Sequence, residues 1–177
     1  IDERTGSAQL TGLRAALDAL CDQATGLLTG AERLAQLKEG LRLEARLHTW
    51  LALQLARVDV AEIATQEHGT STSTWLADAA NLTRREAARL IAAGQGLLRF
   101  PLVADAAATG DLLPGQAEAI TAVLDDLPED FPSDTVREAQ QLLVGFAATH
   151  NSVELRRLTS HLVEILDPAT AEAREAA

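Results

Sequence analysis

Leucine and alanine return every three or four residues along most of this chain, and this spacing restricts its fold more than any other feature. The first such series consists of Leu10, Leu13, Leu17, Leu20, Ala24 and Leu27. Side chains at this spacing share one face of an α-helix, whereas strand residues alternate between faces. No sustained alternating run occurs in the sequence. The pattern therefore predicts an all-α fold, a multi-helix bundle of about eight helices.

The composition agrees with a helical core. Apolar residues make up 47% of the 177 residues but aromatic residues only 3%, so leucine, alanine, valine and isoleucine must supply the packing. Alanine and leucine lose little freedom in a helix, while strands favour β-branched and aromatic residues. A chain of this length can bury a substantial core, either as a single domain or as two compact regions.

The N-terminal region predicts two long helices, over residues 7–28 and 31–67, joined at Thr29 and Gly30. The second pattern carries two apolar stripes: one is Leu34, Leu37, Leu41, Ala45, His48, Ala52 and Leu55, and the other is Leu43, Leu47 and Trp50. Apolar residues on two faces imply a helix packed from two sides. The short link favours an antiparallel hairpin, with a bend near Gly40 or a break near Val60. Whether the hairpin stays within one chain or forms a homodimer is left open.

Capping signals divide the rest of the chain. Gly69 is an expected left-handed cap, Gly110 is expected to close a short helix, and Thr83 with Glu86 and Asn151 with Glu154 form capping boxes. Further helices are expected over 75–80, 83–100, up to 110, 114–127, 133–149 and 151–166. The predicted domains are a hairpin over 1–68 and a compact bundle over 69–168, and residues 169–177 are expected to start a truncated C-terminal region. The chain contains no Met, so Ile1 is not expected to be the natural start.

Charge is distributed unevenly. The net charge of −11 argues against general coating of DNA, which requires lysine and arginine against phosphates. Residues 101–136 contain eight acidic side chains and no basic one, whereas residues 84–100 contain four arginines against Glu86 alone. Those arginines are Arg84, Arg85, Arg89 and Arg99. They are the candidate nucleic-acid-binding residues of this sequence, and they are expected to form its one concentrated positive surface.

The segment 73–99 has the outline of a helix-turn-helix, in which the second helix enters the major groove. On that second helix Arg85, Arg89 and Arg99 lie within about ±40° of one another at 100° per residue. Ile91, Gly94 and Leu98 lie on another face that can pack. The alternative is an ordinary solvated face, because charged residues line the exposed side of most surface helices.

No catalytic residue, metal site or cofactor is predicted in this chain, and no small-molecule substrate is identified. His48 follows Glu44 by four residues, which is not the Glu-x-x-His spacing of di-iron bundles, so structural or solvent-exposed roles are expected for the histidines. The single cysteine, Cys21, lies in an apolar-periodic stretch and is expected to be a passive thiol near the core, because no histidine or basic residue flanks it. No apolar run is long enough to span a membrane, and a cytoplasmic location is expected.

A series of small cues resembles a known family. The series begins with Gly69, Ser73-Thr74-Trp75-Leu76-Ala77, Leu82-Thr83-x-x-Glu86-Ala87, Leu97 and Pro101, and it continues with Ala106, Gly110-x-Leu112, Gln116-Ala117, Ile120, Leu124 and Leu127-Pro128. It resembles the actinobacterial 13E12 repeat family, and in particular its helical domain of unknown function 222. The similarity extends more loosely from about Ala31 to Leu166-Asp167-Pro168. Leu113-Pro114 departs from it, because a polar helix cap is expected there.

The resemblance implies that the full protein is a metal-dependent HNH endonuclease whose catalytic site follows this helical domain, since the HNH signature is not in these residues. Two functions are then open. The chain helps to place a nuclease on DNA through the four arginines, or it is a protein-protein interaction or homo-oligomerisation module that uses helices 7–28 and 31–67. An unrecognised enzyme is a third possibility.

Overall fold

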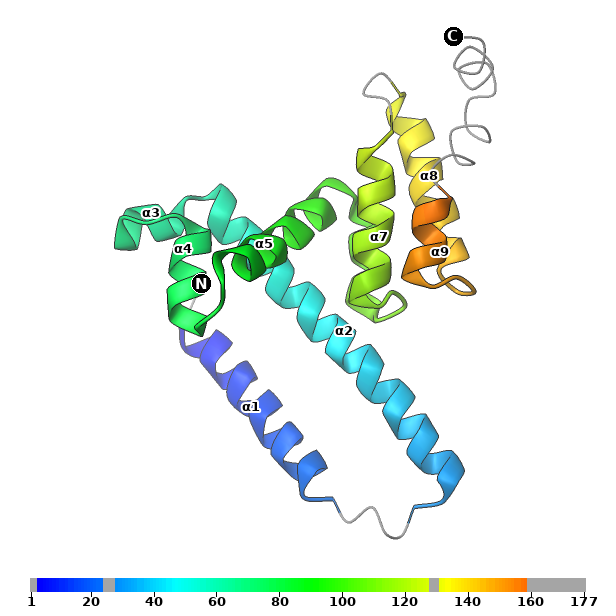
Figure 1. Ribbon diagram of the computed structural model, residues 1–177. Helices are drawn as coiled ribbons and strands as arrows, with labels where there is room; N and C mark the ends of the chain where they lie inside the picture. The colour runs from blue at the N-terminus through cyan, green and yellow to red at the C-terminus, as the bar shows by residue number, and fades with distance from the viewer. Residues whose placement is uncertain (1–2, 24–27, 128–130, 159–177) are drawn as a thin grey trace, which may run out of the picture. The chain divides into compact units, whose positions relative to one another are not determined.

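The computed structural model describes residues 3–23, 28–127 and 131–158, and every regular element among them is an α-helix (Figure 1). The prediction of an all-α multi-helix bundle is confirmed. The helices are α1 (Glu3–Cys21), α2 (Gly30–Val60), α3 (Ile63–His68), α4 (Thr72–Ala80), α5 (Arg84–Arg99), α6 (Pro101–Thr109), α7 (Pro114–Asp125), α8 (Ser133–Phe146) and α9 (Ser152–Arg157). The expected helix to residue 166 and the tail 169–177 extend outside the described residues.

The predicted boundaries are confirmed where a local cap defines them. Thr83 accepts a hydrogen bond from the backbone N–H of Glu86, and the Glu86 carboxylate accepts one from the backbone N–H of Thr83. Gly69 and Gly110 adopt positive φ angles of 67° and 80° at the ends of α3 and α6. The predicted helix 31–67 is divided, because Glu62 takes a left-handed conformation (φ 51°) between α2 and α3. The expected break near Val60 is therefore present.

The chain divides into two compact units, of which the first ends at Glu39 and the second begins at Gly40. The domain boundary expected after residue 68 stays a prediction. The first unit contains α1 and the start of α2. Among its residues whose burial is described, all are exposed except Leu28, which is half-buried. The second unit contains the core. It starts with the C-terminal half of α2 because Ala45, Ala52 and Ala56 of that helix are buried.

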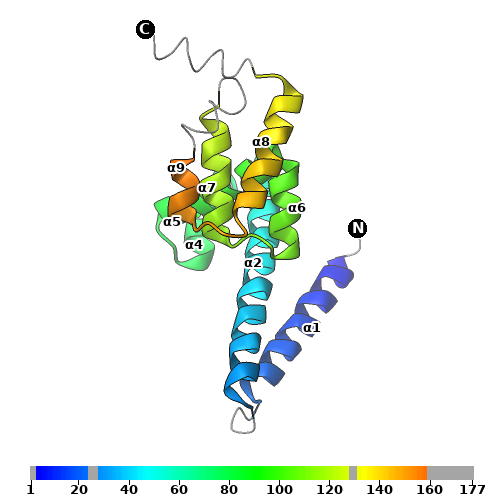
Figure 2. The ribbon, with the colours of Figure 1, turned by 90° about the vertical axis from the view of Figure 1, so that its right-hand side faces the viewer.

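Helix α7 is the centre of the second unit. It packs against α5, α6, α8 and α9, and six of its twelve residues are buried (Figure 2). The largest fully buried side chains are Val103, Leu112, Ile120, Val123, Leu143 and Leu155. Four helices of the same unit therefore surround α7.

Small residues bring α2 and α5 close together. A Cβ atom built on Gly94 of α5 would lie 1.9 Å from the Ala52 carbonyl oxygen and 2.9 Å from the Ala56 Cβ atom. The buried Thr49 hydroxyl hydrogen-bonds the carbonyl oxygens of Ala45 and Ala107, and so ties α2 to the end of α6. This close approach places His48 of α2 beside α5 and α7.

Helix α7 starts without the polar cap that is expected at Leu113. The helix begins at Pro114, and Gln116 replaces the missing group. Its side-chain oxygen accepts from the Leu113 backbone N–H at 3.0 Å, and its amide nitrogen donates to the carbonyl oxygens of Ala147 and His150, each at 2.8 Å. One side chain therefore caps α7 and holds the α8–α9 connection.

No single helix among the described residues is long and apolar enough to cross a membrane. Helices α5 and α6 reach that length and composition only when taken together, and they are bent by 114° at their junction.

Candidate functional site

Helix α5 carries all four predicted nucleic-acid-binding arginines. The Thr83–Glu86 capping box fixes its start, and the hydrogen bonds from the Thr83 hydroxyl and backbone N–H lower the pKa of the Glu86 carboxyl. Ala87, Ile91, Gly94, Gly96 and Leu97 form its buried face. Ile91 and Gly94 pack as predicted, but Leu98 is 39% exposed, so its assignment to the packed face is wrong.

The four arginines do not form one free cationic stripe. Arg84 and Arg85 are exposed in the first turn of α5. Arg89 pairs with Glu118 of α7 at 2.8 Å, and Arg99 pairs with Asp125 at 2.7 Å. The hydrogen bond with Glu118, and then its negative charge, raise the pKa of the Arg89 guanidinium above its usual range.

These two ion pairs correct the expected electrostatics. The sequence predicts a concentrated positive surface separate from the acidic segment 101–136, but Glu118 and Asp125 belong to that segment and lie against α5. They are seven residues apart and therefore two turns apart on one face of α7. Their partners are among the residues of a shallow groove between α5 and α7 whose remaining lining is Ala92, Ala93, Gly96, Thr121 and Ala122. Whether the arginines bind nucleic acid stays a prediction.

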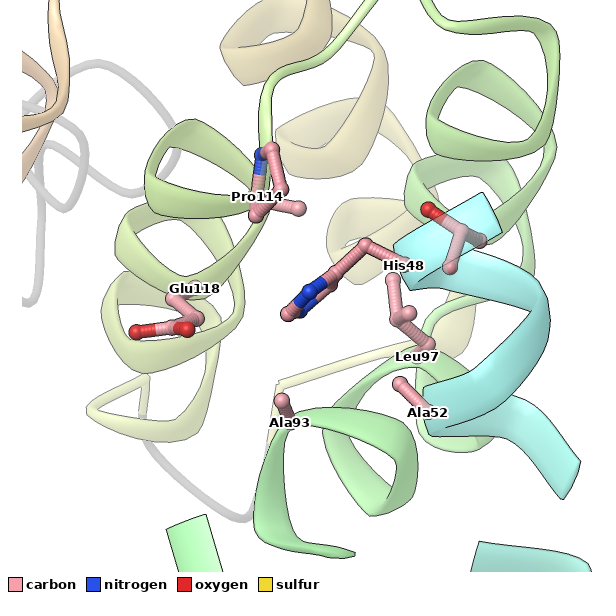
Figure 3. A pocket seen from close by; sticks show the side chains of 8 residues that line it. His48, Ala52, Ala93, Leu97, Pro114 and Glu118 are labelled. Carbon is pink, nitrogen blue, oxygen red and sulfur yellow. The ribbon is translucent and has the colours of Figure 1, made fainter. Parts of the chain in front are cut away.

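A small cavity lies on the other side of the same helix contact. Its lining comes from α2, α5 and α7, and His48, Ala93, Pro114 and Glu118 surround it (Figure 3). The cavity volume is about 10 Å³, enough for one water molecule and too small for an organic ligand. Glu118 borders both the cavity and the groove. No sequence pattern indicates that His48 and Glu118 line one cavity, because the acid at helical spacing from His48 is Glu44.

The other predicted features have simple places in the fold. Cys21 is exposed at the end of α1, so its predicted position near the core is wrong. His68 stacks on Trp75 with ring centroids 6.2 Å apart, and the His150 ring lies against Phe146. His161 lies outside the described residues. Within the described region of the chain, no three His, Cys, Asp or Glu side chains gather as metal ligands would.

The fold and this surface define a class: an all-helical domain built around a central helix, with an Arg-bearing helix beside it. The chain belongs to the family described as Domain of unknown function (DUF222), whose family profile matches residues 31–177. The match begins at Ala31, where the looser sequence resemblance also begins, and it includes α2 to α9 but not α1. No curated protein and no solved structure matches this chain.

Proposed function

We propose that this domain is a self-assembly module in which two copies associate through the leucine-rich surfaces of α1 and α2. The observation that carries this proposal is the exposure of those leucines. Leu10, Leu13, Leu17 and Leu20 of α1 are 39–55% exposed, and Leu34, Leu37 and Leu41 of α2 are 55–70% exposed. Contiguous exposed apolar surface in a folded chain marks an interaction site.

Helix α2 carries exposed apolar side chains on two faces. Its first stripe continues the buried face of Ala45 and Ala52 through Leu41, Leu37 and Leu34. Its second stripe, Leu43, Leu47 and Trp50, lies roughly 150° around the helix at 100° per residue. Leu43 and Trp50 are 46% and 44% exposed. Exposed apolar side chains therefore lie on two faces of α2, and a second copy of the chain can cover them.

The free energy available is sufficient for association. Full burial of one leucine contributes about 1.5–3 kcal/mol, so covering seven leucines that are each about half exposed gives on the order of 5–10 kcal/mol per chain. Some of this offsets the loss of translational freedom, which is itself about 4–15 kcal/mol. Two such surfaces in contact can therefore support a dimer.

The residues that flank the α1 stripe favour a second copy as the partner. With Leu10 and Leu17 at heptad position a and Leu13 and Leu20 at d, the flanking positions hold Gln9, Ala16 and Gln23 on one side and Arg14 and Cys21 on the other. Rows of charge at these positions select an oppositely charged partner helix in coiled coils. Here only Arg14 is charged, so two copies of a chain with net charge −11 can approach along this stripe without facing rows of like charge.

Sedimentation velocity across a concentration series tests the proposal. We expect the wild-type chain to dimerise, and the Leu13→Glu/Leu17→Glu variant to be monomeric. Ala8→Glu/Ala15→Glu is the matched control, because it adds two charges to the opposite face of α1 and should leave the dimer intact. A wild-type chain that stays monomeric at high concentration, or a leucine variant that still dimerises, contradicts self-assembly.

A second candidate function is contact with DNA, and the exposure of Arg84 and Arg85 favours it. Both lie in the first turn of α5, where the helix dipole adds positive potential. The proposed role is to help place a nuclease on DNA, within a cytoplasmic, actinobacterial protein of the 13E12 repeat family that has an HNH endonuclease domain. The complete reading frame tests the proposed HNH endonuclease domain, which should follow Ala177.

Duplex binding measured against salt tests the contact itself. Phosphate contacts by Arg84 and Arg85 predict that Arg84→Ala/Arg85→Ala weakens binding and reduces the slope of log K against log salt by about 2. Arg89→Ala/Arg99→Ala should change the affinity and the salt slope less, because those two side chains are already paired with carboxylates. Absence of binding at low salt, or binding unaffected by replacing all four arginines, rejects this function.

A further inference from the structure

The ring of His48 has an unusual environment. It points from α2 into the cavity between Pro114 and Glu118 of α7, with Ala93 of α5 beside it (Figure 3). Its Nε2 atom is buried and has no hydrogen-bond partner among the described residues. A buried polar atom without a partner is expensive, and a buried charge without one is far more so. His48 therefore gains most from any acceptor that can reach the cavity, above all when the ring is protonated.

Glu118 is the one charged residue among the side chains that line the cavity, all of which lie in the described region of the chain. The lining from α5 is Ala93 and Leu97, and the rest of the α7 lining is Pro114 and Ala117. On α2 itself the nearest acid, Glu44, is exposed one turn earlier. Among the residues that line the cavity, Glu118 therefore carries the one carboxylate that can neutralise a charged His48 ring.

The Glu118 carboxylate also has a second partner. Its Oε2 atom accepts from Arg89 Nη2 at 2.8 Å, and the Arg89 side chain is 73% exposed whereas that of Glu118 is 22% exposed. Glu118 thus lies where the cavity adjoins the groove, with the His48 ring lining the cavity and the exposed Arg89 guanidinium lining the groove. Arginine is long and can leave at little cost, because exposed ion pairs are weak.

We propose that Glu118 is a two-position switch, bound to Arg89 while His48 is neutral and drawn to His48 when the ring is protonated, so that Arg89 is released to solvent. Histidine is the side chain that ordinarily changes charge between pH 5 and 8. While His48 is neutral, one water molecule fits the cavity and can satisfy Nε2. On protonation, a charge-assisted N–H···O bond to Glu118 replaces that water. Released Arg89 adds a free cation to the helix that carries Arg84 and Arg85. The switch does not depend on self-assembly.

The test follows the two paired arginines by NMR. The exchange of the Arg89 guanidinium protons with water is measured between pH 8 and 5, and is expressed relative to Arg99, whose pair with Asp125 lies away from the cavity. Since both groups share the pH dependence of chemical exchange, the ratio reports the ion pair alone. We expect the ratio to rise by roughly two- to fivefold on acidification, the range that loss of an exposed ion pair implies.

Two variants isolate the residues responsible. In His48→Gln, which keeps a polar group of similar length but cannot titrate, the ratio should stay low at every pH. In Glu118→Gln it should be high at every pH, because Arg89 has lost its charged partner. If the Arg89/Arg99 exchange ratio of the wild-type chain does not change with pH, the switch is overturned. This outcome can be read without any variant. The same rise in His48→Gln also overturns it, since another group would then be responsible.

Discussion

The contact of α2 with α5 depends on the absence of one methyl group, and Gly94→Ala tests this directly. The new Cβ atom would lie 1.9 Å from the Ala52 carbonyl oxygen, 2.5 Å from the carbonyl carbon and 2.9 Å from the Ala56 Cβ atom. The first two are backbone atoms, so no side-chain rotation relieves the clash. The two helices must separate by more than 1 Å, as ordinary contact begins near 3.4 Å.

Two effects of opposite sign set the magnitude. Alanine in a helix is more favourable than glycine by about 1 kcal/mol. Inserting atoms into a packed interior costs about 1–3 kcal/mol, and more where the backbone must move. A gap of even 0.5–1 Å also removes roughly a quarter to a half of the dispersion energy of the separated contacts. We expect the clash to win, with a net loss of at least about 2 kcal/mol and a fall in Tm of roughly 4–8 °C.

Urea denaturation followed by circular dichroism measures the free energy of unfolding. Gly145→Ala is the control, because Gly145 is exposed in α8 and a Cβ atom there meets nothing within 4 Å. That variant should be more stable than the wild type by about 0.5 kcal/mol. If Gly94→Ala is stabilising to the same degree, the close crossing of α2 and α5 is wrong.

Two further predictions concern caps. The hydrogen bonds from Thr83 lower the pKa of Glu86 in the folded chain. The stability that the Glu86 carboxylate contributes is therefore fully present above its pKa in the unfolded chain, about 4.3, and is lost as the pH falls through its lower pKa in the folded chain. Glu86→Gln should therefore remove some of the acid-induced loss of helix content in a circular dichroism titration, whereas Glu138→Gln, at an exposed position on α8, should not. Gln116→Ala should reduce the free energy of unfolding in urea by about 1–3 kcal/mol, because it leaves the partly buried Ala147 and His150 carbonyls unpaired, while the exposed Gln141→Ala should have little effect. Equal effects of Gln116→Ala and Gln141→Ala would refute the capping role.

The features predicted correctly from sequence are those that a few neighbouring residues determine. Thr83 and Glu86 are three residues apart, and their reciprocal bonds need only the first turn of the helix they cap. Gly69 and Gly110 end helices because glycine adopts positive φ without a steric penalty. Stripe spacing likewise predicts which face of α5 contains Ile91. In each case the necessary partners lie within one or two turns.

The errors arise where the partner is distant in the chain. Arg89 and Glu118 are 29 residues apart, and their meeting depends on the angle and register of α5 against α7, which no local pattern specifies. The same holds for Gln116, whose acceptors lie 31 and 34 residues further on. The cavity beside His48 needs three helices at once. Sequence patterns therefore place the candidate arginines on the correct helix, but they cannot predict the charge balance around them.

The free energies available from leucine burial and from arginine contacts favour self-assembly over DNA contact. Each exposed Arg–carboxylate pair on α5 contributes at most about 1 kcal/mol, so a phosphate could displace Glu118 or Asp125 with little penalty, but it would also gain little. The exposed leucines of α1 and α2 are different, because nothing except burial relieves their contact with water. Their combined contribution, on the order of 5–10 kcal/mol, exceeds what two exposed arginines can supply in a chain of net charge −11. If the domain contacts DNA, we therefore expect it to do so as an assembled pair that presents Arg84 and Arg85 twice. The Leu13→Glu/Leu17→Glu variant, which prevents assembly, should then weaken duplex binding although no arginine is changed.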